Sequence, residues 1–338
     1  MSKVVGFFCD NADQVDAAAT ETRIRQEDYP KLLQQDEQIV MAFVGRSGKG
    51  RDSFLFTTRR LILIDRKGLT GNKTEFVIIP NSSIQAFSVE TAGTMDSDAE
   101  LTIYAQGMKT TKLKFCKGID VFALHHHLNT VVLKEGFTGA AVPVKDNESA
   151  SGKSHSALFS WIGDDNTQID AAKVEQDLKE KQVLLQDEHV SLAFKSGRDS
   201  FLLSSHRLFK INVQGVTGKK AEYFTITWPS IRAFSIETAG SFDNDTELLL
   251  FTNLSGMTRI NMDFRKGKSD IFAVQRFISD KLLGMDTVDP SANANAAKSG
   301  VFSTVTSVFS WAGDDSKMMD AVKMNKQYHS DPPLLQTC

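Results

Sequence analysis

The sequence predicts a mainly β protein with helices, built from two copies of one small domain in tandem. Two observations carry this prediction: a long internal repeat, and short apolar–polar alternating runs that end, in each copy, in a stretch with helical spacing. The chain has 338 residues, which is long for one hydrophobic core and suits two domains of ordinary size.

The internal repeat fixes the order of the parts. Residues 50–93 match residues 197–240 at a constant offset of 147, and 24 of these 44 positions are identical without a gap. A shorter repeat lies outside the domains, where residues 159–173 recur as residues 309–323, with a weaker relative at residues 7–18. The order is therefore segment, domain, segment, domain, segment.

Each copy is predicted to contain seven strands followed by one helix. Alternation around Phe54 and Phe56 indicates a half-buried sheet, and apolar residues at near-helical spacing predict closing helices at 120–133 and 270–283. In the first copy the strands are expected at Gln38–Val44, Asp52–Thr57, Arg60–Asp65, Glu75–Ile79, Ile84–Glu90, Glu100–Tyr104 and Lys112–Phe115.

The predicted boundaries follow the repeats and the polar stretches between them. Asp164 and Asp165 are expected to cap the helix through Ile169 and Val174, because no loop of alternating oxygen ligands follows them. The expected parts are a leading helical segment (1–33), a first domain (34–135), a linker (136–156), a second helical segment (157–183), a second domain (184–284), a linker (285–300) and a third helical segment with no domain after it (301–338).

Two strings of the first copy identify a family. They are RDSFLFTTRRLILIDRKGLTG and IPNSSIQAFSVETAG, and the second copy has RDSFLLSSHRLFKI and IRAFSIETAG in their places. These strings resemble the bacterial pleckstrin homology domain family, over roughly residues 5–133 and 157–283. The resemblance implies two pleckstrin-homology-like seven-stranded barrels, each closed by a C-terminal helix and preceded by a helical segment. It also implies ring- or sheet-forming binding modules that have no catalytic residues.

Composition excludes several classes of function. A formal net charge of -3 argues against a nucleic-acid partner, because neutralising phosphates needs a surplus of lysine and arginine. No apolar run is long enough to span a membrane, and the first nine residues make a poor secretory signal. Cys9, Cys116 and Cys338 lack metal or redox spacing. A cytoplasmic protein with reduced thiols, no metal and no cofactor is therefore expected.

A basic stretch in the first copy is a candidate anion-binding site. The offset between the copies falls from 151 at Asp36 to 147 at Gly50, so the first hairpin loop is longer in the first copy, where it carries Arg46, Lys49 and Arg51. In lipid-binding pleckstrin homology domains this loop holds a phosphoinositide headgroup, which is what the resemblance implies for these three residues. The alternative is a flexible, solvated hairpin loop.

Other polar residues are expected to be structural. Glu90 and its copy Glu237 end predicted strands with no acid or base nearby in sequence, which favours a carboxylate that fixes a turn. His125, His126 and His127 lie on a helix, where consecutive side chains point about 100° apart, so we expect a partly exposed run that holds no metal. No catalytic set of residues recurs between the copies, so we do not expect an enzyme.

Apolar residues in the helical segments are the expected assembly contacts. The third segment has no following domain in its chain, so we expect it to dock on another copy; such a heterologous contact closes a ring or extends a filament or sheet. The alternative is that this segment folds back on its own chain. The candidate contacts are Phe159 and Trp161 in the second segment, and Phe309, Trp311, Met318, Met319 and Val322 in the third.

The sequence thus favours a non-enzymatic binding or scaffolding protein that self-associates through its tandem domains and helical segments. The alternative is a peripheral adaptor that recognises an anionic lipid headgroup or an acidic peptide with its first domain. The expected partner is another copy of the chain, with a different protein or a weakly bound anionic lipid as the alternatives.

Overall fold

The computed structural model describes the greater part of the two repeated domains. All the described residues belong to the first of the chain's two structural units, residues 1–286. They are residues 11–45, 52–67, 73–93, 98–116, 118–134, 167–196, 198–214, 220–238, 245–265 and 269–285. Residues 11–134 are termed domain 1 and residues 167–285 domain 2.

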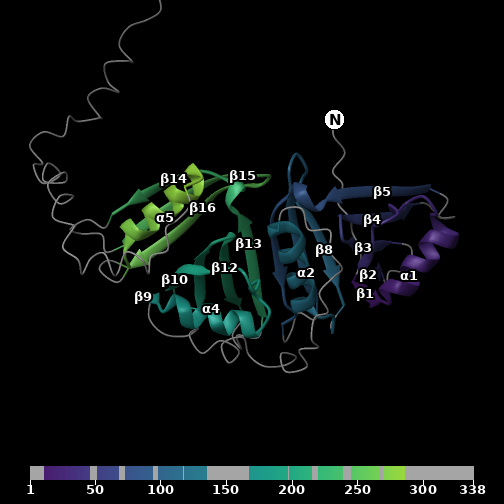
Figure 1. Ribbon diagram of the computed structural model, residues 1–338, viewed down its shortest axis with the longest axis horizontal. Helices are drawn as coiled ribbons and strands as arrows, with labels where there is room; N and C mark the ends of the chain where they lie inside the picture. The colour runs from purple at the N-terminus through teal and green to yellow at the C-terminus, as the bar shows by residue number, and fades with distance from the viewer. Residues whose placement is uncertain are drawn as a thin grey trace, which may run out of the picture. The chain divides into compact units, whose positions relative to one another are not determined.

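Domain 1 is built from antiparallel strands with one parallel bridge (Figure 1). Its strands are β1 (Ala12–Val15), β2 (Ile39–Gly45), β3 (Ser53–Thr57), β4 (Arg60–Lys67), β5 (Lys73–Pro80), β6 (Ile84–Glu90), β7 (Ala99–Ala105) and β8 (Thr111–Phe115). Its helices are α1 (Ala17–Arg23), the π-helical η1 (Ile24–Asp28), the 3-10 turn η2 (Asn81–Ser83) and α2 (Val121–Leu133). Strand β1 joins the two halves of the domain, because it pairs antiparallel with β2 and parallel with β8.

Domain 2 repeats these elements in the same order, except that its described residues have no counterpart of η1. Its strands are β9 (Thr167–Ile169), β10 (Val190–Ser196), β11 (Asp199–Ser204), β12 (Arg207–Gln214), β13 (Lys220–Thr227), β14 (Ile231–Glu237), β15 (Asp245–Leu254) and β16 (Met257–Arg265). Its helices are α4 (Ala171–Glu180), the 3-10 turn η3 (Trp228–Ser230) and α5 (Ile271–Leu283). Strands β14, β15 and β16 form a three-stranded sheet separate from β9–β13.

The expected closed seven-stranded barrels are not observed. The strands of domain 1 and β9–β13 of domain 2 form one thirteen-stranded sheet, in the order β5-β4-β3-β2-β1-β8-β7-β6-β13-β12-β11-β10-β9. Closing domain 1 into a barrel would require β6 to pair with β5, the other end of its own strand order. Strand β6 instead pairs antiparallel with β13, so the domain stays open and its sheet continues into the second domain.

Each leading segment contains a short strand where helix was expected. Strand β1 precedes α1, and Ile169, expected within a helix, ends strand β9. The caps are Asp16 and Asp170, in place of the expected Asp164 and Asp165, which lie outside the described residues. The Asp16 carboxylate accepts a backbone hydrogen bond at 2.6 Å and that of Asp170 accepts one at 3.0 Å. Pairing with β2 and β10 has overridden the local helical pattern.

The leading helices cover the outer face of each first half-sheet, so these strands are buried on both sides. In domain 1, Ile24 and Leu33 pack on Leu55, while Phe54 and Phe56 face the inner core. All three β3 side chains are at most 1% exposed, so the expected half-buried sheet is wrong for this strand. Val174 and Leu178 of α4 play the covering role in domain 2, within a separate cluster of buried residues.

The closing helices begin as predicted, at an aspartate. Asp120 accepts hydrogen bonds from the first turn of α2, and Asp270 does the same for α5. Leu124 and Leu128 of α2 join the inner core of domain 1, as the corresponding residues of α5 do in domain 2. Among the described residues, no helix combines the length and apolar character needed to cross a membrane.

Candidate assembly interface

The two domains meet first through an edge-to-edge strand pair. Strand β6 runs antiparallel to β13, with Val89 opposite Tyr223. The Lys220 ammonium lies 2.7 Å from the Glu90 carboxylate, and Ser88 Oγ donates to Glu222 Oε1 at 2.5 Å. The expectation that Glu90 fixes a turn is therefore wrong, because its carboxylate pairs across the contact between the domains.

The closing helix of domain 1 forms the second part of this contact (Figure 1). Phe122 of α2 joins the outer core of domain 2, where its ring centre lies 5.6 Å from that of Tyr223. The His125 ring lies 5.6 Å from Phe209 and 5.8 Å from Tyr223. Helix α2 is thus packed on both sides: Leu124 and its neighbours face domain 1, and Phe122 faces domain 2.

A buried guanidinium lies at the centre of the contact. Arg207 has no exposed surface, and its Nε and Nη2 bind the two oxygens of Glu188 at 2.8 and 3.1 Å. Its Nη1 donates to Asn129 Oδ1 of α2 at 2.5 Å and to Thr225 Oγ1 at 2.7 Å, and Nη2 also donates to the Val183 carbonyl at 2.8 Å. All five N–H groups of the guanidinium are therefore used, one of them by the other domain.

Side chains of helix α2 also contact backbone carbonyls of the segment that precedes β10. Asn129 Nδ2 donates to the Val183 carbonyl at 3.0 Å and contacts Nδ1 of His125 at 3.1 Å, and Nδ1 of His126 lies 3.2 Å from the Gln182 carbonyl. Burial, together with the positive charge of Arg207, holds the pKa of His125 well below its usual value. His125 is therefore neutral at pH 7.

The expected exposure of the histidine run is wrong for His125 and His127, whereas His126 is part-buried. His125 is 1% exposed and His127 is 7% exposed, because α2 is packed between two cores. Burial lowers the pKa of His127 to about 4. Within the described part of the chain, no group of three or more His, Cys, Asp or Glu side chains is placed to hold a metal ion.

Domain 1 contains a second copy of this arginine–glutamate pair, without an acceptor like Asn129 among the described residues. Arg60 corresponds to Arg207, and its Nε and Nη2 bind Glu37 at 2.9 and 2.8 Å, while Nη2 also donates to the Leu32 carbonyl at 2.8 Å. Burial opposes ionisation of Glu37, but the hydrogen bonds from Arg60, Gln34 and Thr57 outweigh it and lower the pKa of this carboxyl. Within the described residues, Nη1 of Arg60 makes no hydrogen bond.

Each half of the interface therefore recurs elsewhere in the chain with an exposed surface. Tyr223 is 2% exposed within the contact, whereas its copy in domain 1, Phe76, is 38% exposed, and nearby Ile78 is 40% exposed. Phe122 is 8% exposed, whereas its copy in domain 2, Phe272, is 69% exposed. The exposed residues belong to β5 and α5, the repeats of β13 and α2.

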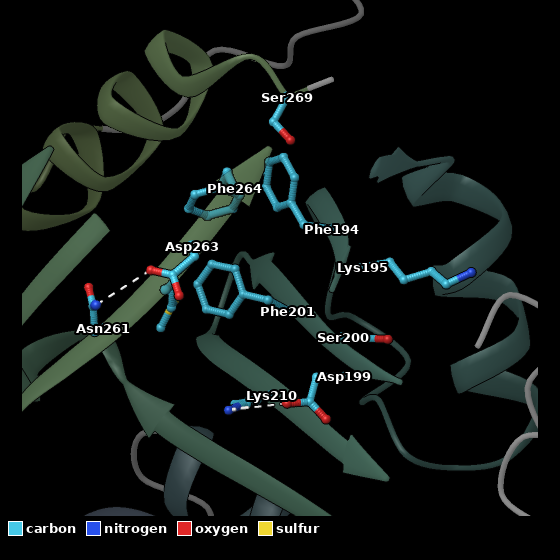
Figure 2. A pocket seen from close by; sticks show the side chains of 11 residues that line it. Phe194, Lys195, Asp199, Ser200, Phe201, Lys210, Asn261, Asp263, Phe264 and Ser269 are labelled. Atoms are coloured by element: carbon cyan, nitrogen blue, oxygen red, sulfur yellow. Dashed lines mark hydrogen bonds and ion pairs between the residues drawn. The ribbon is translucent and has the colours of Figure 1, made fainter. Parts of the chain in front are cut away.

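Domain 2 also contains a pocket of about 160 Å³ between the strand pair β10–β11 and strand β16. Figure 2 shows the rings of Phe194, Phe201 and Phe264 pointing toward one another, while the side chain of Lys195 points away from them. The Phe264 ring centre lies 5.0 Å from Phe194 and 6.2 Å from Phe201. At the rim, Lys210 pairs with an aspartate of β11 at 3.6 Å.

The same aromatic triangle occurs in domain 1, where it is covered. Phe115 lies 4.8 Å from Phe43 and 6.2 Å from Phe54, and Ala12 of β1 packs in this core with no exposed surface. Ala12 pairs with Phe115, whereas the described part of β9 pairs with β10 alone. The two domains therefore differ at this place: β1 bridges the two half-sheets of domain 1, whereas no described strand bridges those of domain 2.

The site residues predicted from the sequence lie outside the described residues. For the anion site these are Arg46, Lys49 and Arg51, so an adaptor role for domain 1 stays a prediction. The predicted assembly contacts also lie outside the described residues and stay predictions: Phe159, Trp161, Phe309, Trp311, Met318, Met319 and Val322.

The interface residues were not predicted from the sequence, although one signal was present. Glu37 and Arg60 recur as Glu188 and Arg207, so the same acid–base pair flanks the same hairpin in both copies. Charged residues that recur at the ends of predicted strands point to a buried pair, since an exposed pair has no packing that would require it. Asn129 left no such signal, because its copy in α5 is Ser279.

The repeated fold matches a known family over most of the chain. The model described as "Bacterial PH domain" matches residues 10–132 and residues 158–282. The chain belongs to the bacterial PH domain family. Its two matched segments correspond to the two halves of the described structure, each with its leading strand and helix.

Two relatives of these bacterial PH domains come from Bacillus subtilis. The chain is 36% identical over 111 residues to the uncharacterized protein YjqA of Bacillus subtilis, covering 33% of this chain and 86% of YjqA. It is 33% identical over 70 residues to the uncharacterized protein YozO of the same organism, covering 21% of this chain and 60% of YozO.

Solved structures with a bacterial PH domain are similar to one part of the chain. A DUF1696 family protein with a pleckstrin-homology domain from Shewanella loihica is 30% identical, with a TM-score of 0.31, and the match covers 36% of this chain and 99% of that one. A pleckstrin homology domain from Shewanella amazonensis is 35% identical, with a TM-score of 0.29, and the match covers 34% of this chain and 89% of that one.

Proposed function

We propose that the chain is a non-catalytic scaffolding protein that self-associates head to tail, by repeating between chains the contact that joins its two domains. The observation that carries this proposal is the pairing of β6 with β13. These two strands are not copies of each other, so the contact is heterologous and leaves the other copy of each surface unused.

The unused copies are strand edges. Strand β5 is the repeat of β13 and strand β14 is the repeat of β6; within the described residues each has a single neighbour, β4 and β15 respectively. An open edge presents unpaired N–H and C=O groups and is a template for pairing with another chain. Shifting the observed register by 147 residues places Phe76 opposite Ile236 of the next chain.

The side chains of the two edges are suited to the same contact. Lys73 and Glu237 are the copies of Lys220 and Glu90, which pair at 2.7 Å within the chain. Phe272 at the start of α5 is the largest exposed copy of an interface side chain, and in this arrangement it packs against Phe76 as Phe122 packs against Tyr223. Burial of such aromatic side chains is the main source of affinity in contacts of this kind.

The mass of the full-length particle, measured by light scattering across a wide concentration range, tests the proposal. We expect the wild type to form particles of several 37.4 kDa chains, and Phe272→Asp to remain a single chain. Met285→Asp is a matched control, because Met285 is also exposed and apolar but follows the end of α5. A wild type that stays at one chain mass, or two variants with the same effect, contradicts the proposal.

Deleting residues 299–338 separates this proposal from assembly through the third helical segment. Strand-edge assembly predicts that the deleted chain keeps its particle mass and still dissociates when Phe272→Asp is added. Loss of the particle on deletion alone supports the segment instead.

A further inference from the structure

We propose that Arg60 of domain 1 is the recognition residue of the junction between chains, and that it binds the side-chain oxygens of Gln275 and Ser279 on helix α5 of the next chain. This inference rests on the proposed function, because it names the polar groups that meet when β14 of one chain reaches β5 of another.

Arg207 and Arg60 differ in the two N–H groups of one nitrogen, Nη1. Within the chain, Nη1 of Arg207 donates to Asn129 Oδ1 on helix α2 and to Thr225 Oγ1 on β13. Arg60 keeps the bonds of its other two nitrogens, to Glu37 and to the Leu32 carbonyl, as Arg207 keeps the equivalent bonds. Its Nη1 makes no hydrogen bond to any described residue, and its side chain is 16% exposed. The guanidinium of domain 1 is thus the same binding site with one nitrogen open.

Helix α5 presents acceptors at the corresponding positions. At the offset of 150 that relates the two closing helices, His125 becomes Gln275 and Asn129 becomes Ser279. The contact inside the helix is preserved in form: Asn129 Nδ2 lies 3.1 Å from His125 Nδ1, and Gln275 Nε2 donates to Ser279 Oγ at 3.1 Å. With its amide nitrogen donating, Gln275 retains Oε1 as an acceptor, and Ser279 Oγ retains a lone pair. Because Gln275 and Ser279 occupy the positions of His125 and Asn129, both side chains lie on the face of α5 that corresponds to the Arg207-binding face of α2.

The junction between chains is the weaker of the two. Ser279 is shorter than Asn129, and Ile78 replaces Thr225, so β5 offers no side-chain acceptor to the second Nη1 N–H. A hydrogen bond to a charged group contributes more than one between neutral groups, so these two replacements matter. The arrangement gives a chain whose domains stay joined while the particle dissociates on dilution.

The test introduces the acceptor of Asn129 into α5 and measures whether any gain in assembly depends on Arg60. Sedimentation velocity on the full chain gives the concentration at which half of the particles dissociate. Ser279→Asn should lower this concentration by up to about tenfold, because the longer side chain strengthens a hydrogen bond to a charged group that Ser279 makes only weakly. The gain should vanish in an Arg60→Lys background, because lysine keeps the charge opposite Glu37 but has no second nitrogen to donate. Asp280→Asn is the control, since it places the amide about 100° around the helix.

A second variant keeps the test decisive if Arg60→Lys fails to fold, which a thermal unfolding curve would reveal. Ile78→Thr supplies the acceptor of Thr225 at a position that is 40% exposed in the isolated chain, and it should also tighten assembly. If neither Ser279→Asn nor Ile78→Thr tightens assembly, or if Ser279→Asn is equally effective in the Arg60→Lys background, the inference is overturned. Dissociation by Phe272→Asp would still support the proposed function. A wild type that is one chain at every concentration overturns both.

Discussion

Asn129 Oδ1 accepts a hydrogen bond from Nη1 of Arg207 at 2.5 Å, which joins the closing helix of domain 1 to the interior of domain 2. Neither side chain has exposed surface. Water cannot replace either partner in this buried position, so the two domains share part of their stability. Replacing either side chain should therefore change the free energy of unfolding.

Replacing Asn129 with alanine should lower the free energy of unfolding by about 2 kcal/mol, because a charged donor of Arg207 is left without its acceptor. Urea denaturation followed by circular dichroism measures this change. Ser279→Ala, at the corresponding position of α5, is the control and should alter the free energy by less than about 0.5 kcal/mol. Equal losses in the two variants would show that the bond to Arg207 adds nothing.

The ion pair of Arg207 and Glu188 should be costly to break from one side. Arg207→Met leaves the Glu188 carboxylate buried without its partner, which should cost about 3–5 kcal/mol. Adding Glu188→Gln should recover part of that loss, since the remaining side chain is then neutral. Arg60→Met is the matched variant at a side chain that is 16% exposed, and its cost should be smaller. Identical costs at the two arginines would contradict the role of burial.

The buried His127 should make the protein sensitive to acid. Its pKa is about 4 in the folded protein against 6.5 for an unperturbed histidine, so the unfolded chain takes up a proton first as the pH falls. The stability present above pH 6.5 is therefore lost between about pH 6.5 and pH 4, by at most about 3 kcal/mol. Thermal unfolding across this pH range measures the loss.

The repeat provides the control for this titration. The residue of α5 that corresponds to His127 is Phe277, so His127→Phe places a side chain already used in this fold at that position. The variant should retain its stability at pH 7 and lose less of it at pH 5 than the wild type. An unchanged pH dependence would assign the acid sensitivity to other groups.

Hydrogen exchange should distinguish the inner strand pair from the two open edges. Amides of β6 and β13 should be protected at every protein concentration, because their pairing is within one chain. Amides along the outer edges of β5 and β14 should become protected only as concentration rises, and Phe272→Asp should abolish that rise. Edges whose exchange is independent of concentration would contradict head-to-tail assembly.

Local pattern was sufficient to predict most of the strands. Each strand expected in the first copy overlaps an observed one, and the helix at Asp120 begins where the apolar spacing predicts, because both patterns are set by neighbouring residues. Strand β1 was not predicted, since its four residues gain their order from pairing with β2 rather than from their own composition.

The interface could not be predicted from local sequence patterns, because its partners lie far apart in the chain. His125 and His127 have the polar composition of a surface helix. His125 is buried because the rings of Phe209 and Tyr223 in the second domain cover it, whereas the ring of His127 contacts Phe56 of its own domain. The turn role predicted for Glu90 is wrong because its partner, Lys220, lies 130 positions further along the chain, beyond the reach of a local pattern. Pairings of this range can be inferred from a repeat only when both partners recur, as Glu37 and Arg60 do.

The pairing of β6 with β13 within one chain has a consequence for how the protein responds to its own abundance. Two domains in one polypeptide meet at an effective concentration set by their connection, which for short linkers is in the millimolar range. The inner contact therefore forms whether the cell makes much or little of the protein. The proposed outer contact, built from the copies of the same surfaces, would depend on the number of chains present. With the proposed junction between chains, tandem duplication converts a single interaction into a constant part and a part that responds to expression level.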